Sequence, residues 1–218
     1  WKMSSIIKQI KLGRPANRTD RTGERIKTML LVAFGQKKMF NRPIPAILHF
    51  IFYVAFIITQ IELIEVFIDG FSGSHRFFYH AGLGTFYTLV ISSIEVLSVL
   101  TFIATLIFFS RRNLIKLPRF SSSDLNGWAR NDANLILLFE LLLIIFIFMM
   151  NGADEVMFNR GISHAAHGIK DSFNFSISGC LGPMLFGGVS DGGLELIERV
   201  GWWGHLLMVL TFLNYLPY

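Results

Sequence analysis

Six histidines and four acidic residues are the side chains that could carry chemistry in this largely apolar sequence. Two of the histidines, His49 and His205, lie inside long apolar segments. Hydrocarbon offers an imidazole no water, so such a histidine hydrogen-bonds to a neighbouring helix or ligates a metal. The other four lie between the apolar segments and are His75, His80, His164 and His167.

The sequence contains one cysteine, Cys180. A single thiol forms no intrachain disulfide and supplies no two-cysteine motif for a zinc or iron–sulfur site within these residues. Any metal held here is therefore expected to be ligated mainly by histidine. The thiol itself is expected to be a buried apolar group.

Four apolar segments must position these residues, at about 44–68, 83–109, 134–150 and 202–218. Mean hydropathy is +0.51 and 52% of the residues are hydrophobic, with 22 phenylalanines among 218 residues. A bilayer core about 30 Å thick is crossed by roughly 20 apolar residues of helix. We therefore predict an all-α integral membrane protein with four spans. From residue 203 the last span covers about 24 Å, so we expect its helix to continue beyond this sequence and the chain to be a fragment.

The distribution of basic residues predicts the orientation of the chain in the membrane. Segments 1–43 and 110–133 hold 11 and 5 of the 20 lysines and arginines, whereas 69–80 and 151–201 hold 1 and 3. By the positive-inside rule the first two lie in the cytoplasm, and the other two, including a long loop at 151–201, lie outside.

Two amphipathic helices are expected beside the spans. Ile26, Met29, Leu30 and Ala33 have helical spacing within the basic segment, which predicts a helix lying on anionic headgroups. The alternative is an ordinary amphipathic helix packed on a soluble domain. The run LELIERV, residues 194–200, predicts a short helix leading into the last span.

The predicted depth of each histidine in the membrane decides which of them can lie close together. His49 lies about six residues into a span that enters from the cytoplasm, and His205 lies about as deep in one that enters from outside. The two are therefore expected in opposite leaflets, too far apart to ligate one iron. For His205 the partners on the outer side are His75, His80, His164 and His167, whereas the sequence supplies none for His49.

Three stretches carry a resemblance: RPIPAILHFIFYVAF, the loop GSHRFF, and WWGHLLMVLTFLNYLPY. They resemble the membrane domain of bacterial heterodisulfide-reductase-like iron–sulfur oxidoreductases, which is related to the cytochrome b (gamma) subunit of respiratory nitrate reductase. The resemblance implies two b haems, one in each leaflet, with His49 and His205 on different haems. It also implies a Ser-Lys-His-like run after the last motif and then a cytoplasmic iron–sulfur domain.

One position departs from the nitrate reductase pattern, in which two histidines three turns apart on one helix serve the two haems. Here Thr59 stands three turns past His49. An outer haem would then take His75 as a ligand, or another outer histidine such as His164.

Four acids lie inside the predicted spans, where a carboxylate is costly unless it is protonated or paired. Glu62 and Glu65 lie near the outer end of their helix and are expected to reach the headgroups. Glu95 and Glu140 lie deeper and are candidates for binding a quinol hydroxyl or passing its protons. Hydrogen bonds to serines of neighbouring helices are the alternative for both.

We therefore expect a cytochrome b-like domain of the bacterial cytoplasmic membrane. It would carry electrons between quinone in the lipid bilayer and a cytoplasmic iron–sulfur protein or electron-transfer flavoprotein, with no nucleic-acid partner. The alternatives are a haem-free anchor in a respiratory complex and a proton-coupled membrane protein using Glu95 and Glu140.

Overall fold

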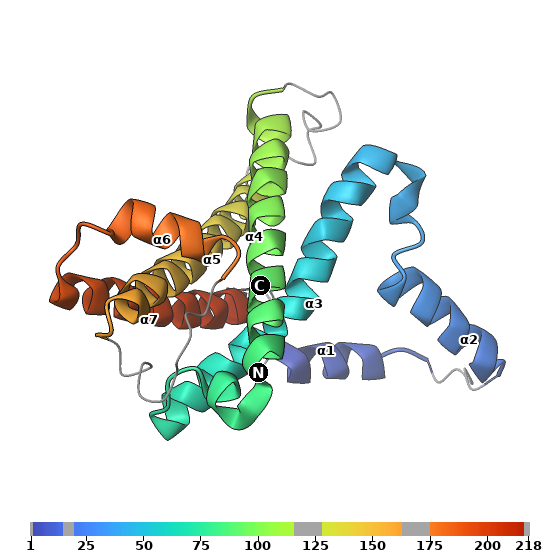
Figure 1. Ribbon diagram of the computed structural model, residues 1–218. Coiled ribbons are helices and arrows are strands. Elements are labelled where there is room, and N and C mark those ends of the chain that lie inside the picture. Colours follow the sequence, from blue (N-terminus) through green and yellow to red (C-terminus); the bar gives the residue numbers. More distant parts are fainter. Residues whose placement is uncertain (1, 15–19, 116–127, 163–174, 216–218) are drawn as a thin grey trace.

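The computed structural model describes residues 2–14, 20–115, 128–162 and 175–215, and their regular structure is helical throughout (Figure 1). Two short helices come first and four long helices follow, with one short helix before the last of them. In chain order the α-helices are α1 Lys2–Lys11, α2 Thr22–Met29, α3 Pro43–Ser72, α4 Gly84–Asn113, α5 Trp128–Asn159, α6 Ser178–Phe186 and α7 Asp191–Tyr215. Leu30–Phe34 and Tyr79–Leu83 form single π-helical turns, and Met39–Asn41 a 3₁₀ turn.

Four of these helices, α3, α4, α5 and α7, are long and apolar enough to cross a membrane. The shortest, α7, has 25 residues and is about 37 Å long, which exceeds a hydrocarbon core of about 30 Å. The prediction of an all-α membrane protein is confirmed. The expected shortness of the last span is wrong, because its helix begins at Asp191 rather than near Trp202.

The region 151–201 was expected to be a loop, but its described residues, 151–162 and 175–201, are largely helical. Helix α5 continues to Asn159, and LELIERV belongs to the first turns of α7 rather than to a separate helix. The polar residues at these helix ends lower the local hydropathy, so the prediction ended α5 too early and began the last span too late. Cys180 lies on α6 and is exposed, so the expectation of a buried thiol is wrong.

Local signals explain the ends of α3. Pro43 occupies its first turn, where the missing N–H costs no hydrogen bond. Gly73 ends it in the left-handed conformation at φ 71°, which glycine adopts without a steric penalty. The next loop, residues 73–78, is fixed by Asp69, whose carboxylate accepts hydrogen bonds from Ser74 Oγ and the backbone N–H of Arg76 at 2.7 and 2.9 Å.

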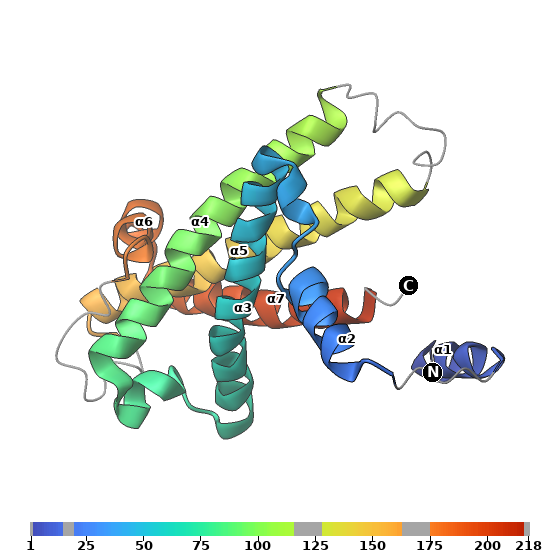
Figure 2. The same cartoon turned by 90° about the vertical axis from the view of Figure 1, so that its right-hand side faces the viewer.

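Helix α5 is the centre of the packing, with α7, α6 and α4 against it, while α3 packs mainly on α4 and touches α7 (Figures 1 and 2). Small residues let these helices approach closely, as is common in membrane bundles. A Cβ at Gly201 would lie 2.7 Å from the backbone nitrogen of Met150. A Cβ at Gly182 would lie 2.5 Å from the carbonyl oxygen of Gly152.

The N-terminal helices lie beside this bundle (Figure 2). The predicted amphipathic helix is present as α2 with its π-helical continuation, and Ile26, Met29 and Leu30 are about half exposed. Its placement on a membrane surface stays a prediction.

Candidate functional site

A cavity of about 390 Å³ lies between α3, α4, α5 and α7, within the range of about 300–1,000 Å³ typical of small-molecule and cofactor sites. Its wall is predominantly apolar, with leucine, isoleucine and phenylalanine side chains from several of these helices. The polar and titratable residues on the wall are His49, Tyr53, Thr59, Gln60, Ser98, Thr101, Glu140 and His205.

His205 is the most enclosed of the predicted ligands. It is 4% exposed, and its Nδ1 atom has no hydrogen-bond partner among the described residues. A buried imidazole nitrogen without a partner is unfavourable in an apolar wall, because it has lost its water. Nδ1 is itself enclosed, and it is the imidazole ring as a whole that lines the cavity wall.

His49 lies on the same wall and is exposed. The sequence argument put the two histidines in opposite leaflets, with His205 only a few residues into its helix. In the structure His205 lies 14 residues after Asp191, about 21 Å along α7. The greater depth of His205 explains how both histidines come to line one cavity.

The two deep acids are in different places. Glu140, on α5, is half-buried and lines the cavity. Glu95 does not line it: its carboxylate accepts hydrogen bonds from Asn151 Nδ2 at 3.2 Å and from the backbone N–H groups of Ile177 and Ser178 at 2.8 and 3.0 Å. Glu95 thus satisfies free N–H groups at the start of α6, as a helix cap does. Interhelical hydrogen bonding was the alternative expected for this residue, although with serines as partners.

A buried ionic cluster occupies the end of the bundle closed by loop 73–78. Arg76 is its centre and is 3% exposed. Its guanidinium donates to Asp154 Oδ2 from Nε and from a terminal nitrogen at 3.0 and 2.7 Å, and it donates to Asn151 Oδ1 at 2.5 Å and Tyr87 Oη at 3.3 Å. The backbone of Arg76 has φ 57°, a conformation that costs of order 1–3 kcal/mol in a non-glycine residue. Its contacts, with those of Asp69, hold it there.

Glu62 and Glu65 also belong to this cluster, which corrects the expectation that they reach the headgroups. They are 1% and 2% exposed. Glu65 accepts hydrogen bonds from Tyr87 Oη and the backbone N–H of Phe78 at 2.7 and 2.9 Å. Glu62 lies 3.9 Å from an Arg76 nitrogen. The Glu65 carboxylate points into the bundle because Tyr87 and a backbone N–H offer it donors there, and the Glu62 carboxylate faces the charge of Arg76.

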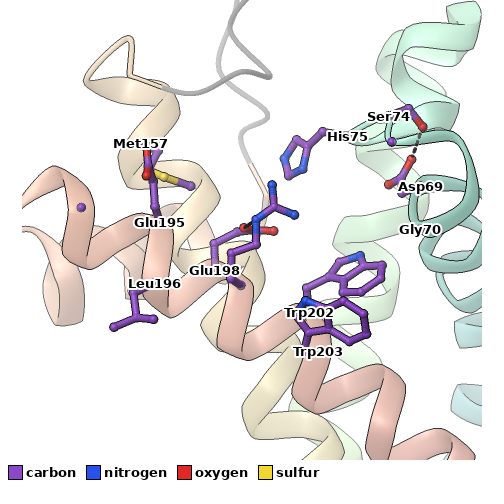
Figure 3. A pocket seen from close by; sticks show the side chains of 13 residues that line it. Asp69, Gly70, Ser74, His75, Met157, Glu195, Leu196, Glu198, Trp202 and Trp203 are labelled. Atoms are coloured by element: carbon purple, nitrogen blue, oxygen red, sulfur yellow. Dashed lines mark hydrogen bonds and ion pairs between the residues drawn. The ribbon is translucent and has the colours of Figure 1, made fainter.

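His75 borders this cluster and lines a second pocket, of about 750 Å³, with Glu198, Trp202 and Trp203 (Figure 3). Its Nε2 lies 3.2 Å from Asp154 Oδ1. Burial lowers the pKa of His75, but the adjacent carboxylate of Asp154 outweighs that effect and raises the pKa above its usual value. His75 is not on the wall of the cavity that holds His205.

His80, the other histidine in the described part of the chain, lines neither pocket. His80 is exposed and packs edge-on against Tyr79. His164 and His167 lie outside the described residues.

The sequence argument missed four residues of the ionic cluster: Arg76, Asn151, Asp154 and Glu198. Three of them stood in the region taken as an outer loop, and Arg76 stood in the short loop before α4. A helical signal was available, because Asn151 and Asp154 follow an apolar run at a spacing of three residues, one turn of helix.

Comparison with known proteins gives one informative similarity. The chain is 29% identical over 208 residues to the probable iron–sulfur-binding oxidoreductase FadF of Bacillus subtilis (strain 168). The match covers 95% of this chain but 26% of that protein, so the chain spans about a quarter of the length of this relative. No family model and no solved structure matches the chain.

Proposed function

We propose that this chain is the membrane part of an electron-transfer oxidoreductase and that its apolar cavity holds a b haem. The observation that carries the proposal is the apolar cavity, whose wall carries two imidazoles, those of His205 and His49. FadF, the relative over this membrane region, is named an iron–sulfur-binding oxidoreductase, which supports an electron-transfer role for the similar chain.

The residues present fit a haem. The wall is apolar, as a porphyrin requires, and histidine is the usual axial ligand of b-type iron. His205 is the ligand that the geometry supports best, and His49 is the second. When bound, the haem supplies one-electron redox chemistry. The protein's own part is to position the imidazoles, keep water from the wall and set the polarity around the site.

A reduced-minus-oxidised visible spectrum of the purified protein tests this proposal. We expect the sharp α band of a b haem in the wild-type protein, and its loss or reduction in His205→Ala and in His49→Ala. If each substitution removes a different haem, the two histidines serve separate irons, and if both remove the same one, they share it. His80→Ala, at an exposed position, is the control. Absence of the band in the wild type would favour the haem-free alternatives, an anchor or a proton-coupled membrane protein.

Quinone is the proposed substrate in the bilayer, and Glu140 is the proposed residue for its hydroxyl or proton, since its carboxylate lines the cavity. Glu140→Gln is expected to slow quinol-linked turnover and to leave the haem spectrum intact. Glu24→Gln, on α2 and exposed, is the control. Loss of haem in Glu140→Gln would instead give this residue a part in the haem site.

The electron partner is proposed to be iron–sulfur clusters in a further part of the polypeptide or in a separate protein, because these residues hold one cysteine. A cytoplasmic electron-transfer flavoprotein is the other proposed partner. We place the four spans in a bacterial cytoplasmic membrane, with 1–43 and 110–133 on the cytoplasmic side, on the strength of the basic-residue distribution.

A further inference from the structure

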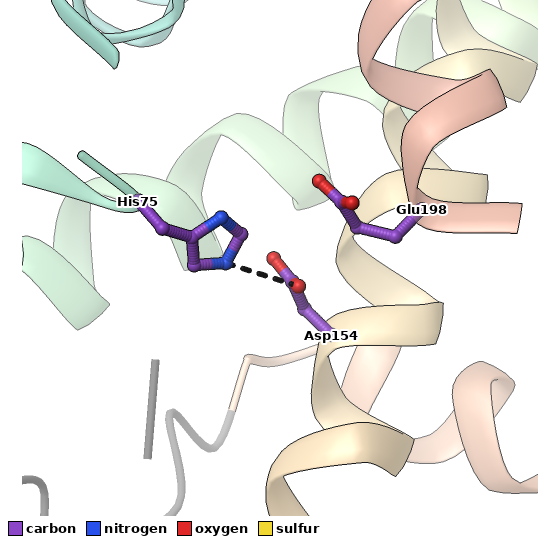
Figure 4. A group of neighbouring side chains, drawn as sticks. All are labelled: His75, Asp154 and Glu198. Atoms are coloured by element: carbon purple, nitrogen blue, oxygen red, sulfur yellow. Dashed lines mark ion pairs between the residues drawn. The ribbon is translucent and has the colours of Figure 1, made fainter. Parts of the chain in front are cut away.

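Three side chains beside Arg76 direct ligand atoms toward one point (Figure 4). They are His75, Asp154 and Glu198, and one nitrogen or oxygen from each lies within 4.8 Å of the others. They come from three separate elements: the loop after α3, the end of α5 and the first half of α7. A ligand held by all three would join these elements.

Each carboxylate of this group uses one oxygen elsewhere and leaves the other free. Asp154 Oδ2 accepts two hydrogen bonds from Arg76, and Glu198 Oε2 lies 3.3 Å from Arg199 Nε. Asp154 Oδ1 and Glu198 Oε1 are buried without a hydrogen-bond partner among the described residues. His75 Nε2 also has no hydrogen-bond partner there, and it lies 3.2 Å from Asp154 Oδ1 as an ion pair. Three ligand atoms thus lie near one another, and two of them are paired only with each other.

The carboxyl groups around these three residues also favour a bound cation. Glu62, a fourth carboxylate, is 1% exposed, and neither of its oxygens has a hydrogen-bond partner in the described part of the chain. It shares with His75 and Arg76 a small void of about 10 Å³, close to the least that holds one water molecule. Arg76 and a protonated His75 face the carboxyl groups of Glu62, Asp154 and Glu198 here, and a divalent cation would take the place of the proton on His75 as counter-charge.

We propose that His75, Asp154 and Glu198 form a binding site for a divalent cation of the zinc class, separate from the haem cavity. One imidazole and two carboxylates are ligands that zinc accepts, whereas calcium and magnesium prefer oxygen alone. Ligands about 2.1 Å from a tetrahedral zinc lie about 3.4 Å apart. The 3.2 Å between His75 and Asp154 already meets this separation, and the ligand atom of Glu198, within 4.8 Å of both, would close the remaining distance on binding.

His75 and Glu198 also line the 750 Å³ pocket, which gives an ion an entry path to this site (Figure 3). The cation takes the place of a proton on His75 and joins loop 73–78 to α5 and α7. Its role is to hold this end of the bundle together, and it requires no haem.

Zinc binding by the purified protein in lipid nanodiscs tests the proposal. After treatment with a chelator, the protein is titrated with Zn²⁺ in competition with a chromophoric chelator, and the zinc X-ray absorption edge is recorded. We expect one tightly bound zinc per chain with one histidine nitrogen and carboxylate oxygens as ligands. The zinc edge is distinct from that of iron, so the result does not depend on the haem proposal.

Two substitutions and two matched controls locate the site. Glu198→Gln and His75→Gln are each expected to weaken zinc binding at least about tenfold. Glu195→Gln, exposed one turn away on α7, and His80→Gln, exposed near the same loop, are expected to bind as the wild type does. Equal binding in all four variants, or a wild-type protein without tightly bound zinc, overturns the proposal. If a variant misfolds, the ligand types at the wild-type zinc edge decide the question alone.

Discussion

Replacing Arg76 with glutamine is the most severe test of the buried ionic cluster. Arg76 is 3% exposed and makes two charge-assisted hydrogen bonds to Asp154, which is 1% exposed. Removing one partner of such a pair leaves an uncompensated charge in the interior, at a cost of about 3–5 kcal/mol. With roughly 2–4 °C per kcal/mol for a chain of this size, the melting temperature should fall by about 6–20 °C.

The assay is unfolding of the purified protein by heat and by a denaturing detergent, with a double-mutant cycle to isolate the pair. Arg76→Gln combined with Asp154→Asn should be more stable than the sum of the single effects by about 1–3 kcal/mol, because the second change removes the charge that the first exposed. Arg199→Gln, whose side chain is 62% exposed at the same end of the bundle, should cost about 1 kcal/mol or less. Strictly additive losses at Arg76 and Asp154, or equal losses at Arg76 and Arg199, would refute the assignment.

Two further predictions concern packing and orientation. Gly201→Ala should cost about 1–3 kcal/mol, because the new methyl meets the backbone of α5, whereas Gly192→Ala, which meets no atom within 4 Å, should show no such clash; equal unfolding curves for the two would mean that the helices are not in close contact. For orientation, Asp191→Cys in a Cys180→Ser background should react with an impermeant thiol reagent in intact cells, and Lys37→Cys should not; the reverse pattern would invert the membrane topology.

The existence of the spans was predictable from composition, since long apolar runs have few alternatives to a membrane helix. Their ends were not predictable in the same way. Hydropathy falls at Asn151 and rises again near Trp202. The third span was therefore predicted to end before Asn151, and the last span to begin near Trp202. In the structure those residues continue the helices, because Arg76 compensates Asp154 and the bundle itself supplies the polar environment.

The candidate site was predictable only in part, because its residues could be identified from the sequence but their arrangement could not. A histidine within an apolar run is visible without a fold, so His49 and His205 were identified, but their common cavity depends on the true start of α7. The buried role of Glu62 depends on Arg76, which follows a left-handed glycine in a loop and has no periodic signal. Pairing between such a loop and three helices is a tertiary property that no local pattern encodes.

The ionic cluster and the histidine cavity are linked along α7. Glu198 and His205 are seven residues apart, two turns of helix, and therefore lie on nearly the same face. Gly201 lies between them and lets that face pack closely against α5. Helix α5 carries both Asp154 and Glu140. A one-residue slip of α7 against α5 would move Glu198 and His205 together, by about 1.5 Å along the axis and 100° around it. The register of α7 against α5, which the close approach at Gly201 fixes, therefore sets the positions of Glu198 and of the histidine two turns below together.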